Sequence, residues 1–280
     1  MKNKICIVTG ASQGIGKETA ISLARMGAEV VMVSRDHERA IVARDEITKQ
    51  TGNRNIQIEL ADLSRIDSVR ELAKRLSSQY STVDVLINNH GALFNRYLLS
   101  VDGLEMNFAL NHLSYYLLTN LLLDNLKKSG GRIVNVSAHV HINIECDFLA
   151  RPMSPATYNP WDAYCQSKLA NILFTYALAR RLEGTNTTVN CLHPGSTQTL
   201  ALKTAREIYV RLNGPTEFPQ LMTLEAAAET SLYLATSPEV QGVSGKYFVR
   251  CESVPSSDLS YDLSLQEKLW RLSAELTGLG

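Results

Sequence analysis

The stretch Lys4-Ile-Cys-Ile-Val-Thr-Gly-Ala-Ser-Gln-Gly-Ile-Gly16 decides the fold of this chain. Its first half is a short apolar run of the kind that forms a buried parallel strand. Glycines follow at positions 10, 14 and 16, and residues 17–26 then have helical composition. An ordinary strand-to-helix loop is the alternative, but strand, glycine turn and helix in this order favour a pyrophosphate site. Glycine lets the backbone approach phosphates, and the helix N-terminus offers them unpaired N–H groups.

A second motif places Tyr164 four residues before Lys168. Apolar residues recur with helical spacing across residues 163–182, so the two side chains are expected on one helix face, with Cβ atoms about 5–6 Å apart. A nearby ammonium favours the phenolate and lowers the tyrosine pKa. Such a pair alone is common on solvated helix faces; the glycine turn upstream makes a tuned acid–base pair the better interpretation.

Together these motifs resemble the short-chain dehydrogenase/reductase family, in its compact single-domain branch. The spacing Gly-x-x-x-Gly-x-Gly and the later Tyr-x-x-x-Lys carry the resemblance, which runs from residue 5 to about residue 249. Residues 164–174 and 33–36 look most like retinol-dehydrogenase-like members, a branch that includes the oxidoreductase domain of the WW-domain oxidoreductases. The similarity thins after Thr199, so fold and chemistry are expected to carry over better than substrate.

The resemblance implies a catalytic set of Ser137, Tyr164, Lys168 and Asn111. Tyr164 would donate a proton to a carbonyl oxygen, or accept one from an alcohol as the phenolate. Ser137 would orient and polarise the substrate oxygen. Lys168 would lower the tyrosine pKa and hold the nicotinamide ribose, and Asn111 would anchor a water that connects Lys168 to solvent.

The same resemblance implies where a nicotinamide dinucleotide binds. Asp62 matches the family's adenine-contacting acid, the segment Asn88-Asn-His-Gly91 carries His90 in place of the usual alanine, and Pro194-Gly195 matches the stretch that receives the carboxamide. The expected cofactor-binding residues are Gly10, Ser12, Gln13, Gly14, Ile15, Gly16, Ser34, Arg35, Asp62, Leu63, Asn89, Gly91, Tyr164, Lys168, Pro194, Gly195, Thr197 and Thr199.

The residues just after the second predicted strand indicate which nicotinamide is used. An acid there would accept hydrogen bonds from the ribose 2′-OH and repel a 2′-phosphate. This chain has Ser34 and Arg35 instead, and a guanidinium matches phosphate geometry. Asp36 is expected to cap the next helix. NADP(H) is therefore the predicted cofactor, with Arg35 as a solvated surface charge the alternative.

Apolar runs alternate with helical patterns along the chain, at 4–9, 29–34, 56–60, 83–88, 131–137, 187–193 and 246–249. This alternation predicts one α/β domain over residues 1–280, a doubly wound (Rossmann) parallel sheet of about seven strands with helices on both faces and order 3-2-1-4-5-6-7. The Pro-rich segment 151–160 and the stretch 201–221 look irregular or loosely helical. The second is interpreted as a substrate lid, and a plain surface insertion is the alternative for each.

The C-terminal stretch 263–279 has the apolar spacing of an amphipathic helix, which would pack on the body or meet a partner chain. Many members of the family pair through the helices that carry Asn111 and Tyr164, so the resemblance implies a homodimer or homotetramer.

Composition narrows the class of protein. Lys plus Arg and Asp plus Glu number 28 each, so charge does not indicate a nucleic-acid partner. No apolar stretch approaches the ~20 residues of a membrane span. The first predicted strand begins within four residues of the N-terminus, so no signal peptide is expected. The five scattered cysteines form no Cys-x-x-Cys pair, so neither a metal site nor a disulfide frame is expected, and the predicted location is cytoplasmic.

The histidines are given secondary roles. His139 and His141 follow Ser137 and are expected to shape the substrate mouth or lie on the surface, while His112 and His193 are expected to pack at element ends. His90 either contacts cofactor or substrate or fills the alanine's place.

The predicted function is an NADP(H)-dependent oxidoreductase, a carbonyl reductase or alcohol dehydrogenase acting on a small apolar carbonyl compound or alcohol. The alternative is an NADP-binding redox sensor without turnover. Nucleotide-sugar epimerases use the same Tyr and Lys but need another glycine spacing and a larger C-terminal domain.

Overall fold

The computed structural model describes residues 1–144, 147–150, 153–218 and 220–280. Within them, eight strands form one sheet in the order β3-β2-β1-β4-β5-β6-β7-β8. The strands are β1 (Ile5–Thr9), β2 (Glu29–Ser34), β3 (Ile56–Leu60), β4 (Val85–Asn88), β5 (Arg132–Val136), β6 (Thr188–His193), β7 (Tyr247–Val249) and β8 (Glu252–Val254). The first seven are parallel, and the predicted order is confirmed.

The eighth strand was not predicted. It pairs antiparallel with β7 through a two-residue turn, in which Arg250 and Cys251 have φ values of 51° and 65°. Left-handed residues at both turn positions match the right-handed twist of a hairpin, and they are usually Asn or Gly. Because Arg and Cys stand there instead, the sequence carries no recognisable turn signal.

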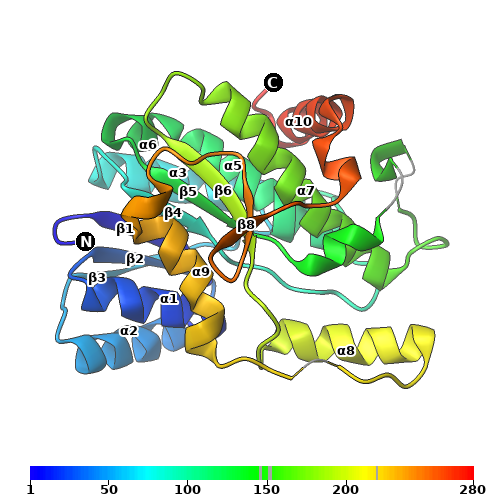
Figure 1. Cartoon of the computed structure of the whole chain (residues 1–280), viewed down its shortest axis with the longest axis horizontal. Coiled ribbons are helices and arrows are strands. Elements are labelled where there is room, and N and C mark those ends of the chain that lie inside the picture. The colour runs from blue at the N-terminus through cyan, green and yellow to red at the C-terminus, as the bar shows by residue number, and fades with distance from the viewer. Residues whose placement is uncertain (145–146, 151–152, 219) are drawn as a thin grey trace.

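Helices cover both faces of the sheet (Figure 1). One face packs against α1 (Gly14–Arg25), α2 (His37–Thr51) and α9 (Leu224–Thr236). The other packs against α3 (Ile66–Gln79), α5 (Ser114–Leu121), α6 (Leu123–Ser129) and α7 (Pro160–Arg181). Side chains of β1 alternate between the two cores: Ile7 belongs to the second, and Cys6 and Val8 belong to the first. This is the period-two pattern of a strand that is buried on both faces.

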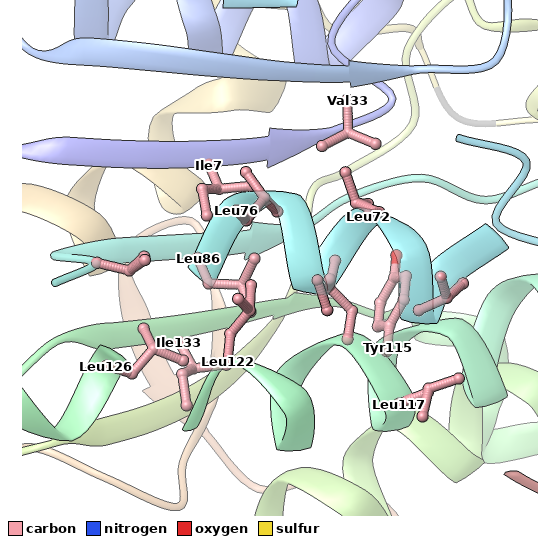
Figure 2. Close-up of a cluster of buried hydrophobic side chains, with 14 of the residues drawn as sticks. Ile7, Val33, Leu72, Leu76, Leu86, Tyr115, Leu117, Leu122, Leu126 and Ile133 are labelled. Carbon is pink, nitrogen blue, oxygen red and sulfur yellow. The ribbon is translucent and has the colours of Figure 1, made fainter. Parts of the chain in front are cut away.

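Figure 2 shows the core between the sheet and α3. Ile7 and Val33 come from the strands and meet Leu72 and Leu76 of α3, and all four are fully buried. Tyr115 of α5 joins the same cluster. Burying a side chain such as leucine stabilises the fold by about 1.5–3 kcal/mol. The core therefore fixes the sheet's carboxyl edge, from which the candidate site is built.

The remaining elements are short helical turns and two longer helices. They are α4 (Met106–Phe108), the π-helical turn η1 (Ala109–Leu113), the 3₁₀ turns η2 (His139–Asn143), η3 (Phe148–Ala150), η4 (Pro238–Val240) and η5 (Asp258–Tyr261), and the helices α8 (Leu200–Asn213) and α10 (Leu263–Thr277). In Figure 1, α8 stands off from the sheet and α10 lies beside α7. Among the described helices, none has both the length and the apolarity to cross a membrane.

Candidate active site

The glycine turn between β1 and α1 has the shape that a bound diphosphate requires. Gly10 and Gly14 have φ values of 70° and 57°, which favour glycine. A Cβ on Gly16 would lie 2.4 Å from the carbonyl oxygen of Gly10, so the backbone is too close for a side chain. Gln13 makes no side-chain hydrogen bond to the first turn of α1. The helix N-terminus therefore keeps backbone N–H groups that can donate hydrogen bonds to a diphosphate. The glycine turn thus fits a bound diphosphate.

Polar side chains gather at the tip of β2. The hydroxyl of Ser34 donates to that of Ser12 at 3.2 Å, which joins two predicted cofactor residues, and Arg35 is exposed beside them. Asp36 caps α2 by accepting from the backbone N–H of Arg39 at 3.0 Å, as predicted.

Sequence reasoning missed Arg39. Its guanidinium donates to Gln13 Oε1 at 3.1 Å and pairs with Asp36 at 2.9 Å, so it lies between the glycine turn and the cap of α2. The sequence signal that could have identified Arg39 is its position one turn after Asp36, the predicted N-cap. The region of Ser34 thus has a second arginine within reach of the glycine turn.

The loops after β3 and β4 are fixed by local hydrogen bonds. Asp62 Oδ1 accepts from the backbone N–H and the hydroxyl of Ser64, at 3.0 and 2.7 Å, and Leu63 beside it is buried. Asn89 donates through its side chain to the carbonyl of Thr9 at 2.8 Å, which ties the β4 loop to β1. The two loops therefore have defined positions at the carboxyl edge.

His90 lies against the glycine turn. Its Nδ1 would be 3.0 Å from a Cβ on Gly10, and its carbonyl accepts from Tyr115 Oη at 2.8 Å. Burial, followed by the charges of Arg35 and Lys168, lowers the His90 pKa to about 4, so the ring is neutral at neutral pH. Of the interpretations left open by the sequence, this position favours the cofactor side of the site.

Tyr164 and Lys168 share one face of α7. The Lys168 Nζ lies 5.7 Å from the centroid of the Tyr164 ring and donates to the Val136 carbonyl at 3.2 Å. A Cβ on Gly91 would lie 3.3 Å from both Lys168 Nζ and Asn111 Oδ1. Glycine at position 91 therefore leaves open a small space that these two polar groups border.

Ser137 follows β5 and lies beside the same helix. Its hydroxyl donates to the Lys168 carbonyl at 2.7 Å, and only 2% of the residue is exposed. The hydroxyl proton must rotate away from that carbonyl before Ser137 can donate to a substrate oxygen. Its contact nevertheless brings Ser137 to the helix that carries the Tyr–Lys pair.

Asn111 lies in the π-helical turn η1, a distortion that is frequent at functional sites. Its side chain exchanges hydrogen bonds with the backbone of Ala92, both at 2.9 Å, and donates to the hydroxyl of Ser167 at 3.0 Å. Ser167 in turn donates to the Tyr164 carbonyl at 2.7 Å. Ser167 was missed by the sequence reasoning, and it connects Asn111 to the catalytic helix.

In this structure burial sets the direction of the Tyr164 pKa shift. Burial, with a smaller contribution from Cys165, raises the Tyr164 pKa above its usual value of 10. Burial also lowers the Lys168 pKa to about 8. Desolvation disfavours the charged form of each group. The site therefore holds a protonated phenol at neutral pH.

The segment after β6 closes over the glycine turn. Thr197 and Met222 form a bridge between the two ends of the 201–221 segment, and Thr197 Oγ1 donates to the Met222 carbonyl at 2.8 Å. A Cβ on Gly14 would lie 3.6 Å from Thr199 Cγ2. Gly195 has a φ of 86° and follows Pro194 at the end of β6. The residues predicted to receive the carboxamide thus lie next to the diphosphate turn.

The 201–221 segment is more regular than predicted. Its first two-thirds form the helix α8, capped by Thr199, which accepts from the Leu202 N–H at 3.2 Å. Apolar residues at helical spacing were the overlooked signal. Of the Pro-rich segment predicted to be irregular, residues 151–152 lie outside the described residues, and α7 already begins at Pro160.

An apolar cluster joins α8 to Tyr164. Leu93, Ala205 and Ile208 form its buried centre, and Trp161 and Tyr164 pack against it. The rings of Trp161 and Tyr209 meet edge to face, with centroids 5.1 Å apart. The phenol of Tyr164 is therefore bordered by hydrocarbon from the β4 loop, α7 and α8.

Three histidines lie at the carboxyl ends of β5 and β6. His139 is exposed, and its ring centroid lies 6.4 Å from that of His141 and 6.0 Å from that of His193. His141 is buried, so of its two predicted roles, shaping the substrate mouth or lying on the surface, the surface role is wrong. Across the residues that the structure describes, no group of three His, Cys, Asp or Glu side chains is arranged to hold a metal ion.

With this geometry established, comparison with known proteins is informative. The family model described as short chain dehydrogenase matches residues 4–147, about half of the chain. Human retinol dehydrogenase 13 is 40% identical over 284 residues, which cover 99% of this chain and 85% of that protein. The chain belongs to the short-chain dehydrogenase family. The predicted family and its retinol-dehydrogenase-like character are confirmed.

Solved structures agree with this assignment. The crystal structure of an uncharacterised protein from Mycobacterium paratuberculosis is 32% identical, with a TM-score of 0.77, and the match covers 99% of this chain and 94% of that one. A short chain dehydrogenase from Escherichia coli CFT073, complexed with NADPH, is 27% identical with a TM-score of 0.70, over 90% of this chain and 98% of that one.

Proposed function

We propose that this short-chain dehydrogenase is an NADP(H)-dependent oxidoreductase that interconverts an apolar aldehyde or ketone and the corresponding alcohol. The observation that carries the proposal is the meeting of Ser137, Tyr164 and Lys168 beside the glycine turn, with an apolar cluster bordering the phenol. When bound, the nicotinamide would supply or accept the hydride. The protein's residues would position the substrate and move the proton.

Tyr164 is the proposed proton donor. Its phenol is protonated at neutral pH and can donate that proton to a carbonyl oxygen. Ser137 would turn its hydroxyl from the Lys168 carbonyl to the same oxygen. Lys168, bordering the open space at Gly91 with Asn111, would hold ribose hydroxyls and restore the proton by way of solvent.

The choice of NADP(H) rests on charge at the tip of β2. Arg35 is exposed there and Arg39 reaches Gln13, while Ser34 stands where an acid would repel a 2′-phosphate. Two guanidinium groups near one phosphate would bind it through charge-assisted hydrogen bonds. The NADPH in the E. coli relative supports the same choice.

The proposed substrate is a retinoid-like aldehyde or alcohol. Leu93, Ile208 and Trp161 offer hydrocarbon next to Tyr164, which suits a long apolar molecule with one terminal oxygen. Retinol dehydrogenase 13, by its name, acts on an alcohol of this kind. We include the 201–221 segment in the site as a lid. The cytoplasmic location and the homodimer or homotetramer stay predictions.

The experiment is a single assay with a matched pair of variants. Purified protein and NADPH are mixed with all-trans-retinal and a panel of other aldehydes and ketones, and NADPH oxidation is followed by absorbance. Tyr164→Phe keeps the ring but removes the proton, so kcat should fall by about 10²–10⁴-fold while NADPH binding persists. Tyr233→Phe, on the opposite face of the sheet, should keep the wild-type rate. Tight NADPH binding without turnover on any substrate would instead support a redox sensor.

A further inference from the structure

The C-terminal segment contacts all three elements that carry the proposed catalytic set. We call residues 256–277, which comprise η5, α10 and the residues just before them, the C-terminal clamp. In Figure 1 this segment returns from β8 across the end of the molecule and runs beside α7. The contacts fall next to Ser137, next to Asn111, and next to both Tyr164 and Lys168.

The first contact holds the loop after Ser137. The backbone N–H of Ser257 donates to His141 Nε2 at 3.1 Å, and His141 Nδ1 bonds the Ala138 carbonyl at 2.9 Å. The two bonds require a neutral ring with its proton on Nδ1. His141 is only 1% exposed, so it links the residue that follows Ser137 to the clamp through a buried side chain.

The second contact holds the π-helical turn at Asn111. His112, the next residue, is completely buried and bonds Ser273 of α10 through Nε2 at 2.8 Å. Its Nδ1 faces Asn171 Oδ1 of α7 at 3.4 Å. An amide oxygen only accepts, so Nδ1 carries the proton and Nε2 accepts from the Ser273 hydroxyl. Burial lowers the His112 pKa to about 3, which keeps this arrangement at neutral pH.

The third contact is apolar and lies along the catalytic helix. Cys165 and Leu169 each follow a catalytic residue, and both pack against Leu265 and Leu269 of α10 in one buried cluster. Trp270 adds ring contacts to Phe174 of α7 and Tyr116 of α5, with centroids 5.9 and 5.0 Å apart. The C-terminal clamp thus packs against both α5 and α7.

We propose that the C-terminal clamp positions the catalytic set, and that His112 with Ser273 is the polar contact through which it fixes the turn of Asn111. This rests on the function proposed above. Ser273 touches neither substrate nor cofactor, so it is a positioning residue. A displacement of about 1 Å in a catalytic group can reduce the rate by about 10²-fold. Losing the hydroxyl leaves the buried Nε2 without its donor, and the turn must shift to satisfy it.

The test compares three substitutions on α10. Ser273→Ala removes the hydroxyl, Ser273→Thr keeps it, and Ser264→Ala makes the same change at an exposed position of the same helix. The measurements are kcat and KM for all-trans-retinal with NADPH, the NADPH dissociation constant by fluorescence, and backbone hydrogen exchange.

We expect Ser273→Ala to lower kcat about tenfold or more, with KM and NADPH binding within about twofold, and to speed exchange over residues 109–113. Ser273→Thr should recover most of the rate, and Ser264→Ala should match the wild type. A Ser273→Ala variant that melts earlier but keeps the wild-type kcat would show that the clamp only stabilises the fold. If the wild type reduces no carbonyl, the proposed function fails, and unchanged exchange in Ser273→Ala would then refute the clamp by itself.

Discussion

Replacing Lys168 by methionine should make the ligand-free protein more stable while disabling the proposed site. The ammonium is 3% exposed, and burial lowers its pKa from 10.5 to about 8. Each pH unit of that difference corresponds to about 1.4 kcal/mol, so keeping Lys168 charged at neutral pH costs about 3 kcal/mol. Methionine fills a similar space without a charge.

One contact opposes this gain. Lys168 Nζ donates to the Val136 carbonyl at 3.2 Å, and losing that bond costs about 1 kcal/mol. The net expectation is a free energy of unfolding higher by about 2 kcal/mol at pH 7, which for a chain of this size raises Tm by roughly 4 °C. Lys74→Met, at an exposed position of α3, should change stability by no more than about 0.5 kcal/mol.

The pH dependence tests the cause. A group whose pKa is lower in the folded state than in the unfolded state destabilises the fold wherever it is protonated in both. That cost is complete below about pH 8 and disappears as pH rises toward 10.5. Urea unfolding of both proteins, followed by circular dichroism at several pH values, should show the difference shrink over this range. A Lys168→Met variant less stable than wild type at pH 7, or a gain that persists at pH 10, would refute the reasoning.

Two further predictions concern the cofactor and the lid. Arg35→Asp should weaken NADP binding by a few kcal/mol, because it removes a charge-assisted hydrogen bond of roughly 1.5–3 kcal/mol and adds repulsion. Arg39→Ala should weaken the binding of NADP but not that of NAD. Calorimetric titration that shows a wild-type preference for NAD would overturn both expectations. Binding of NADPH and substrate should slow hydrogen exchange across residues 200–218, because a lid held by ligands would open less often. Equal exchange with and without ligands would identify a static insertion.

Much of the fold could be predicted because its parallel strands are short apolar runs with little ambiguity. Strand β2 was placed at its observed limits, and β1 and β5 within one residue at each end. The antiparallel β8 was missed, since Arg250 and Cys251 give no turn signal. The stretch that forms α8 was predicted to be irregular or loosely helical, and it is a regular helix. Local pattern therefore predicted the parallel strands and the C-terminal helix well, but it missed β8 and described α8 only loosely.

The residues of the candidate site were likewise predicted only in part. Motif residues such as Tyr164 and Lys168 could be identified from spacing, and the structure brings them next to Ser137. The sign of the tyrosine pKa shift could not be predicted, because it depends on how much solvent the fold removes from the phenol and not on the distance along the helix. Arg39 reaches Gln13 across 26 residues, and such a contact leaves no trace in local pattern.

In this protein, the role of a histidine cannot be inferred from its residue type alone. His90, His112 and His193 all have pKa values of about 4 or lower, and burial is the first cause for each. A neutral imidazole has one donor and one acceptor, so its neighbours decide its use. His90 lies against the glycine turn, where we propose that the cofactor binds. His112 is bonded on both sides, to residues 59 and 161 positions away, and joins the C-terminal helix to the catalytic one. Its effect on the reaction therefore depends on how firmly those partners hold it.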